Sequence, residues 1–302
     1  MTQFHVLVNC PFGDFVDDTS LSPIDRKYCL SLVNGFEDGH WQTKSFLEFI
    51  WDNVKETALS KKEREALADK ESSMLDRAVV NLRITDDDIT GGEIAEILLY
   101  GVMRHHYGAL PVVPKIFYKQ NKNDFAKGAD SVHIVIEKDS SFSLWLGEAK
   151  FYRTLDNAHL DKIIKSVHDT LSTEKIKKEN TIITNLSDLY EFEEIPKDLR
   201  NSIINLLRAS SIDGLKKHLH IPILLLHQCN ITTKAIEADK VYFNNIVDDY
   251  KKKANVYFAK QIEGCKDIFK YDEITFHLIL FPVPDKKDIV NKFKSKANAY
   301  RS

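Results

Sequence analysis

The chain has 302 residues, of which 43% are hydrophobic and 29% are charged, and 42 Lys and Arg against 45 Asp and Glu leave a formal net charge of -3. The apolar fraction is enough to bury a core, which excludes a chain that is disordered throughout. The near-neutral charge excludes a generally basic protein that coats nucleic acid, so any contact with phosphates requires a local patch or a partner.

The first part of the chain, residues 1–90, is predicted to be a short strand followed by helices rich in charge. The strand is expected at Phe4 to Val8. Apolar residues within Ser45–Leu59 recur with the spacing of one helix face. The repeated Glu and Lys of Lys61–Ala78 predict an exposed helix.

Residues 91–173 carry the clearest pattern. Gly91 and Gly92 open a predicted helix with the sequence GEIAEILLYGVMRHHYG, which ends at Gly108. Three strands are expected next, at Val112–Tyr118, Ser131–Glu137 and Phe142–Phe151. Only the polar residues 138–141 separate the last two strands, so we predict that they form an antiparallel hairpin. A helix is expected from about residue 157.

Residues 174–302 continue with helices and two strongly apolar strands, at Ile221–His227 and Ile274–Phe281. A long helix is expected near 236–263, and a basic amphipathic helix after Pro284. The mixed order of elements predicts an α/β or α+β fold around a central sheet. We expect a strand and helical region at 1–90 that packs on a core at 91–302, in one compact unit.

No segment predicts export or membrane insertion. The start, MTQFHVLVNC, lacks a basic stretch followed by a long apolar one, so we expect no signal peptide. The longest apolar runs fall far short of the roughly 18–20 residues that span a bilayer. The four cysteines are scattered without a CxxC pair, which argues against a zinc knuckle or a disulfide framework. We therefore expect a cytoplasmic protein with no membrane contact.

Two charges interrupt the apolar strand FSLWLGEAKFY. Glu148 and Lys150 are two residues apart and therefore point to the same side of the strand, with Ala149 turned to the other. Buried charges are costly unless they have partners or a ligand. A weak ion pair at a solvated strand end is the alternative interpretation. A Schiff-base lysine is another, but nothing nearby in the sequence forms a recognisable phosphate or aldehyde site.

The predicted hairpin brings a third charged residue to the same place. Opposed residues of an antiparallel pair keep a constant sum of residue numbers, so a turn centred on Asp139 sets Asp130 opposite Glu148. Opposed side chains share a face, and a register slip of one residue would separate these two.

A cation is expected between these carboxylates, because they repel each other without one. Carboxylate oxygens suit Mg²⁺, and the backbone carbonyl of Ala149 would supply a further oxygen ligand beside Asp130 and Glu148. Next to the metal, Lys150 would orient or deprotonate a water molecule and stabilise negative charge on a phosphate. This arrangement favours metal-assisted hydrolysis of a phosphodiester.

The preceding helix offers a further carboxylate. Glu93 and Glu96 are three residues apart and share a helix face. We favour Glu96, which lies one turn deeper in the helix, although both fit. Glu93 is equally explained as a first-turn glutamate that the helix dipole stabilises.

The ordered set of Glu96, Gly128-Ala129-Asp130 and Glu148-Ala149-Lys150, followed by a helix, resembles the PD-(D/E)XK nuclease core. The motifs GEIAEILLY, KGADSVHI and LWLGEAKFY, with the later ILFPVP, resemble more narrowly the HamA family over roughly residues 90–285. HamA proteins are the nuclease subunits of the Hachiman anti-phage defence system. The resemblance implies an α/β restriction-endonuclease-like core, in which helices flank a mixed central sheet, with helical additions at both ends.

The resemblance also implies an activity and a partner. It implies a Mg²⁺-dependent deoxyribonuclease, with Mn²⁺ as a substitute ion, which cleaves DNA in complex with a HamB-like superfamily-2 helicase. The family's Asp, Glu and Lys carry over to Asp130, Glu148 and Lys150. One alternative is a catalytically silent nuclease fold that binds and regulates a helicase. Another is a free-standing restriction-type nuclease.

Overall fold

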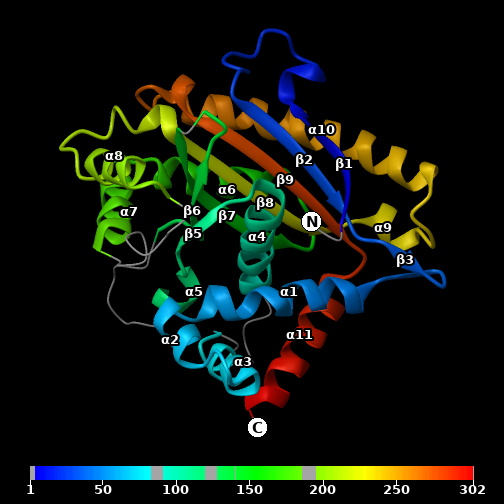
Figure 1. The fold of residues 1–302 in the computed structure, drawn as a ribbon. Helices are drawn as coiled ribbons and strands as arrows, with labels where there is room; N and C mark the ends of the chain where they lie inside the picture. Colours follow the sequence, from blue (N-terminus) through cyan, green and yellow to red (C-terminus); the bar gives the residue numbers. More distant parts are fainter. Residues whose placement is uncertain (1–3, 83–90, 120–127, 140, 186–194, 302) are drawn as a thin grey trace.

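Within the described residues, seven strands form one mixed sheet through the centre of the molecule (Figure 1). The computed structural model describes residues 4–82, 91–119, 128–139, 141–185 and 195–301. In spatial order the strands are β1 (His5–Pro11), β2 (Lys27–Val33), β9 (Thr275–Val283), β8 (Leu219–Gln228), β7 (Phe142–Tyr152), β6 (Ser131–Ile136) and β5 (Leu110–Val113). The central strands β2, β9, β8 and β7 are parallel, and the strands at both edges pair antiparallel. A separate small hairpin joins β3 (Phe36–Glu37) and β4 (His40–Trp41).

Helices cover both faces of this sheet (Figure 1). They are α1 (Thr43–Ala58), α2 (Lys61–Ala66), α3 (Glu71–Val80), α4 (Gly92–Tyr107), α5 (Lys115–Lys119), α6 (Asn157–Thr170), α7 (Thr173–Asn185), α8 (Lys197–Leu207), α9 (Asn230–Lys234), α10 (Lys240–Cys265) and α11 (Lys286–Arg301). Short 3-10 helices lie at Phe12–Asp14, Lys216–His218 and Tyr271–Glu273. None of the described helices is long and apolar enough to cross a membrane.

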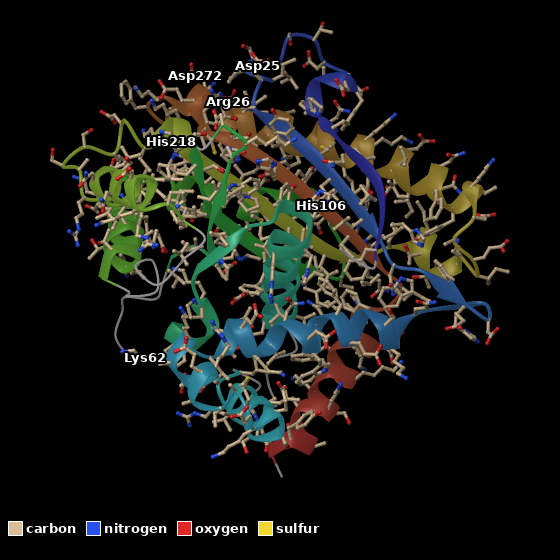
Figure 2. The ribbon with its side chains drawn as sticks, viewed as in Figure 1. Asp25, Arg26, Lys62, His106, His218 and Asp272 are labelled. Carbon is tan, nitrogen blue, oxygen red and sulfur yellow. The ribbon has the colours of Figure 1, made fainter. Side chains whose placement is uncertain are left out.

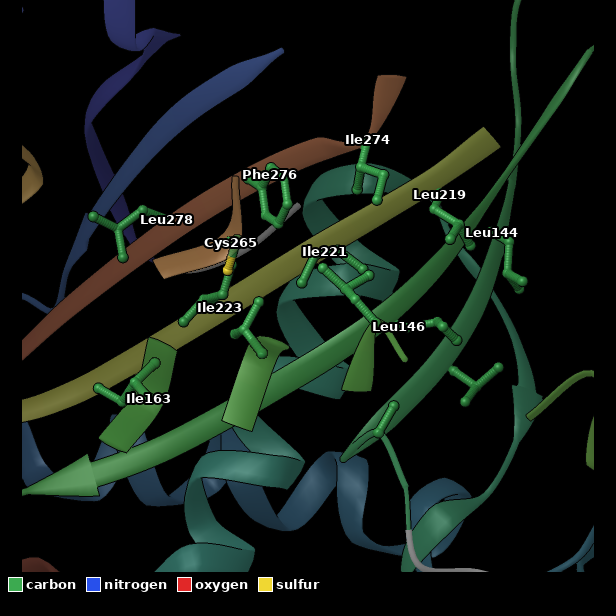
Figure 3. Packing of buried hydrophobic residues seen from close by; sticks show 14 of the residues in the cluster. Leu144, Leu146, Ile163, Leu219, Ile221, Ile223, Cys265, Ile274, Phe276 and Leu278 are labelled. Atoms are coloured by element: carbon green, nitrogen blue, oxygen red, sulfur yellow. The ribbon is translucent and has the colours of Figure 1, made fainter. Parts of the chain in front are cut away.

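Strand β8 shows how the two faces are divided, because its side chains alternate between two apolar clusters. Ile223 and Leu225 pack with residues of α6, α7, α8 and α10. Leu224 and Leu226 pack on the other face with residues of α1, α3, α4 and α11. Figure 3 shows part of the first cluster, in which Ile163 of α6 lies against the sheet. Burial on both faces explains why the parallel strands are continuous apolar runs.

Helix α4 packs closely on α1 and β7 because glycines lie at both contacts, one in the helix and one in β7. A Cβ atom at Gly101 would lie 2.5 Å from the Phe49 ring of α1. A Cβ atom at Gly147 of β7 would lie 2.7 Å from Leu99 of α4. The helix ends at Gly108, whose φ of 62° is the left-handed conformation that favours glycine. Figure 2 shows His106 at this end of α4.

Most of the predicted elements are present. The mixed α/β class with a central sheet between helices is confirmed. The predicted helix from Gly92 to Gly108 corresponds to α4, and the apolar runs of β8 and β9 form neighbouring parallel strands. The β6–β7 hairpin is antiparallel, as predicted, and of its turn residues Ser140 lies outside the described residues.

Three expectations were wrong. The strand predicted at Val112–Tyr118 stops at Val113 and gives way to α5, because Pro114 lacks the N–H group needed to continue a ladder. The single helix expected at Lys61–Ala78 is two helices, α2 and α3, and α3 buries an apolar side. The first 90 residues also contain β2, a mostly buried strand that was predicted as helical and that lies between β1 and β9 in the sheet.

Candidate active site

Asp130 lies directly before β6 and opposite Glu148 of β7. The register pairs Ser131 with Gly147 and continues to Ile136 with Phe142, which is the predicted register. The backbone N–H of Asp130 donates a hydrogen bond of 2.7 Å to the carbonyl of Gly147. Because opposed residues share a face of the sheet, the hairpin brings the two carboxylates to one side of β7.

Lys150 joins the two carboxylates. Its Nζ lies 2.5 Å from Oε1 of Glu148 and 3.3 Å from Oδ2 of Asp130. The same ammonium group donates a hydrogen bond of 3.2 Å to the backbone carbonyl of Ala149. The oxygens that the sequence suggested as metal ligands therefore already surround one positive charge. The three groups are two acids and one base, so their own charges sum to -1 when all three are ionised.

The cluster lies at the boundary between core and solvent. The side chain of Glu148 is 7% exposed and that of Asp130 is 14% exposed, whereas that of Lys150 is 34% exposed. A ligand can therefore reach the carboxylates from the side on which Lys150 meets solvent.

Two further hydrogen bonds fix the carboxylates. The N–H group of Ala149 donates to Oδ2 of Asp130 over 3.1 Å. The hydroxyl of Ser166 on α6 donates to Oε1 of Glu148 over 2.8 Å. Ser166 was not predicted as a site residue. Its signal was position, because Ser166 follows Ile163 by three residues and so lies near the side of α6 that packs on the sheet.

The local electrostatics set the protonation of the cluster. Burial, followed by the negative charge of Asp130, raises the pKa of Glu148, and Lys150 partly offsets this. Burial alone would lower the pKa of Lys150, but the combined attraction of Asp130 and Glu148 is stronger and raises it above its ordinary value. Lys150 is therefore an ammonium at neutral pH, and in this arrangement it is a hydrogen-bond donor and not a base.

Glu93 and Glu96 lie in the first two turns of α4 and are half-buried. This helix packs on the face of β7 that carries Ala149, whereas Glu148 points to the other face, toward Ser166 of α6. The contacts that assemble the cluster come from β6, β7 and α6. A role for either α4 glutamate, and the choice between them, stays a prediction.

A second group of metal-ligand types lies elsewhere in the described residues. Single ligand atoms of His227, Cys229 and Asp249 lie within 4.8 Å of one another, at the end of β8 and on α10. Burial lowers the pKa of His227 to about 4, so its ring is neutral at pH 7. Asp249 forms an ion pair with Lys253, which already supplies a positive charge to its carboxylate. None of its three residues belongs to the Asp130, Glu148 and Lys150 cluster, although His227 pairs with Tyr152 of β7.

Comparison with known proteins shows the family to which the chain belongs. A sequence model of the HamA family matches residues 11–297. The chain belongs to the HamA family. The matched span begins at the end of β1, ends within α11, and includes Asp130, Glu148 and Lys150. Membership of the HamA family suggests a component of a Hachiman defence system, in agreement with the motifs. No curated protein matches the chain.

Proposed function

We propose that the chain is the Mg²⁺-dependent DNA nuclease of a Hachiman defence system and that it works in complex with a superfamily-2 helicase. The observation that carries this proposal is the convergence of Asp130, Glu148 and Lys150 at the β6–β7 hairpin. The flanking α4 and α6 supply the helices that a PD-(D/E)XK core has before and after such a hairpin. Membership of the HamA family supports the same assignment.

The residues present fit a magnesium ion. Asp130, Glu148 and the Ala149 carbonyl offer three oxygen atoms, all of which contact the Lys150 ammonium group. Hard oxygen ligands of this kind suit Mg²⁺, with Mn²⁺ as a substitute. A divalent ion would offset the charges of both carboxylates, whereas the lysine carries a single positive charge. The ion would supply charge neutralisation and a water molecule of lowered pKa.

The chain's own groups would position and stabilise the reacting phosphodiester. Ser166 and the N–H group of Ala149 hold the two carboxylates in place before the substrate arrives. Lys150, which stays protonated, would donate hydrogen bonds to the phosphate oxygens as negative charge develops on them. The expected product is a cleaved DNA strand, with water as the nucleophile.

A partner is part of the proposal because the chain does not carry a strongly positive charge. Its net charge of -3 gives weak general attraction for DNA, so a helicase that delivers the strand would supply the missing affinity. A HamB-like helicase is the partner that the motifs imply. The DNA then needs to reach only the exposed side of Lys150.

One observation favours a different function. The Lys150 ammonium fills the position between the carboxylates, so their repulsion is already reduced without a metal ion. A catalytically silent module that binds and regulates the helicase would be stable in this state. The two carboxylates brought to one lysine and the partial exposure of that lysine favour the nuclease, because a silent module gains nothing from either.

Plasmid cleavage by the chain with its helicase and ATP tests the proposal. Glu148→Gln and Lys150→Met should each reduce cleavage about 100-fold or more, since each removes a group that acts on the developing charge. EDTA should abolish cleavage, and Mn²⁺ should restore it. The matched control is Lys165→Met, which removes an exposed lysine of α6. Metal-independent cleavage, or both variants cutting at the wild-type rate, would contradict the nuclease; helicase binding without any cleavage would favour the silent module.

A further inference from the structure

A buried ion pair lies beside the candidate site. Lys115 of α5 and Glu179 of α7 are joined by contacts of 2.7 and 2.9 Å between Nζ and the two carboxylate oxygens. Their side chains are 3% and 1% exposed. Buried ion pairs often stabilise a fold no better than apolar residues of similar size. This pair therefore calls for an explanation other than stability.

The carboxylate of Glu179 also binds the backbone of the Gly-Ala-Asp motif. Its Oε1 accepts a hydrogen bond of 2.9 Å from the N–H group of Ala129. A Cβ atom at Gly128 would lie 1.8 Å from the same oxygen, closer than any side chain can come. Glycine is therefore required at this position so that the carboxylate can lie against the main chain. This contact gives a physical reason for the glycine in the motif.

The next residue after these two is Asp130. The backbone N–H group of Asp130 donates a hydrogen bond to the carbonyl of Gly147 on β7. Its carboxylate accepts a hydrogen bond from the N–H group of Ala149 on the same strand. Glu179 thus holds the chain just before Asp130, while β7 holds it at Asp130. The Lys115 ammonium fixes both carboxylate oxygens of Glu179, which leaves the anchor little freedom to rotate.

We infer that Glu179, fixed by Lys115, is a positioning residue that sets the backbone entering β6 so that Asp130 meets Glu148 and Lys150. Its importance for metal binding and cleavage rests on the proposed nuclease function. Its effect on the backbone does not, because the hydrogen bonds of Ala129 and Ala149 join protein groups only.

Two double variants separate the hydrogen bond from the ion pair. Lys115→Met with Glu179→Gln removes both charges but keeps a side-chain oxygen that can accept from Ala129. Lys115→Met with Glu179→Met removes both charges and that oxygen, in side chains of similar length. Neither variant leaves an unpaired buried charge, so both are expected to fold. Glu174→Met, an exposed change on α7, is the control.

Amide hydrogen exchange of the full chain is the first readout. In the Met/Met variant the amides of Ala129 and Ala149 should exchange at least about 10-fold faster than in the Met/Gln variant, while amides of the central strand β8 stay unchanged. Equal exchange of both amides in the two variants would overturn the inference, whatever the chain's activity.

Affinity for Mn²⁺, measured by calorimetry, is the second readout. The Met/Met variant should bind about 10-fold more weakly than the Met/Gln variant, the size of effect seen when groups that orient metal ligands are removed. If exchange changes as expected but the wild type binds no Mn²⁺, the positioning role stands and the nuclease proposal fails. If the wild type binds Mn²⁺ and both double variants bind it equally, Glu179 does not position the site.

Discussion

The two charge clusters next to the Gly-Ala-Asp motif are built differently. Lys115 and Glu179 are one base and one acid, almost completely buried, with charges that balance. Asp130, Glu148 and Lys150 are two acids and one base at the solvent boundary, with charges that do not balance. A buried pair of one acid and one base suits an anchor. A cluster that brings two carboxylates to one lysine at the solvent boundary can bind a further cation, which is why we propose chemistry for it and positioning for the other.

The largest expected effect on stability is in the balanced pair. Lys115→Met would leave the Glu179 carboxylate buried without a counter-charge, at a cost of about 3–5 kcal/mol in the free energy of unfolding. Lys150→Met should cost no more than about 2 kcal/mol, because Lys150 is partly solvated and Glu148 can take up a proton instead. Urea denaturation of both variants at pH 7 measures the two costs. A larger loss for Lys150→Met would invalidate the contrast between the clusters.

A medium effect is expected from Gly128→Ala, which tests the contact between the anchor and the motif. The added Cβ would lie 1.8 Å from Oε1 of Glu179, so the carboxylate or the main chain must shift. Overpacking of this kind typically costs about 1–3 kcal/mol, and we expect the displaced Asp130 to reduce cleavage as well. Gly214→Ala is the control, since its Cβ would meet Leu206 at an ordinary 3.6 Å. Calorimetric unfolding that shows equal losses for both variants would argue against a special contact at Gly128.

The convergence of Asp130, Glu148 and Lys150 could be predicted from the sequence because it depends on local geometry. Strand alternation fixes the relation of Glu148 to Lys150, and a short turn fixes the register that adds Asp130. The residues that support the set could not be predicted in this way. Ser166 and Glu179 reach the site from α6 and α7 through tertiary packing, and such polar residues on amphipathic helices usually lie in solvent.

The difference between local geometry and tertiary packing also explains the errors in the predicted fold. Strand β2 pairs in parallel with β9, which lies about 250 residues later in the chain, so nothing near β2 in the sequence indicates its partner. Its first residue, Lys27, is buried and lies over the ring of Tyr271. A lysine at this position makes the segment look charged and exposed when only the sequence is considered. The β6–β7 hairpin was predictable because its two strands are adjacent in the sequence, whereas parallel pairing depends on distant contacts.

The smallest expected effect concerns a buried histidine of β6 that belongs to neither charge cluster. His133 of β6 is buried, and neither ring nitrogen has a hydrogen-bond partner among the described residues. Burial lowers the pKa of His133 to about 3, so the folded chain keeps the ring neutral where the unfolded chain, with a pKa near 6.5, binds a proton. The stability contributed by the neutral ring is complete above pH 6.5 and is lost as the pH falls from there toward 3, by about 1.4 kcal/mol per pH unit. His133→Leu should remove the His133 share of this loss and leave stability at pH 7.5 nearly unchanged or slightly higher, while buried His227, whose pKa is also lowered, keeps its own share. Urea denaturation at pH 7.5 and 5.5 checks it, and a loss of stability on acidification as large in the variant as in the wild type would show that His133 does not contribute to it.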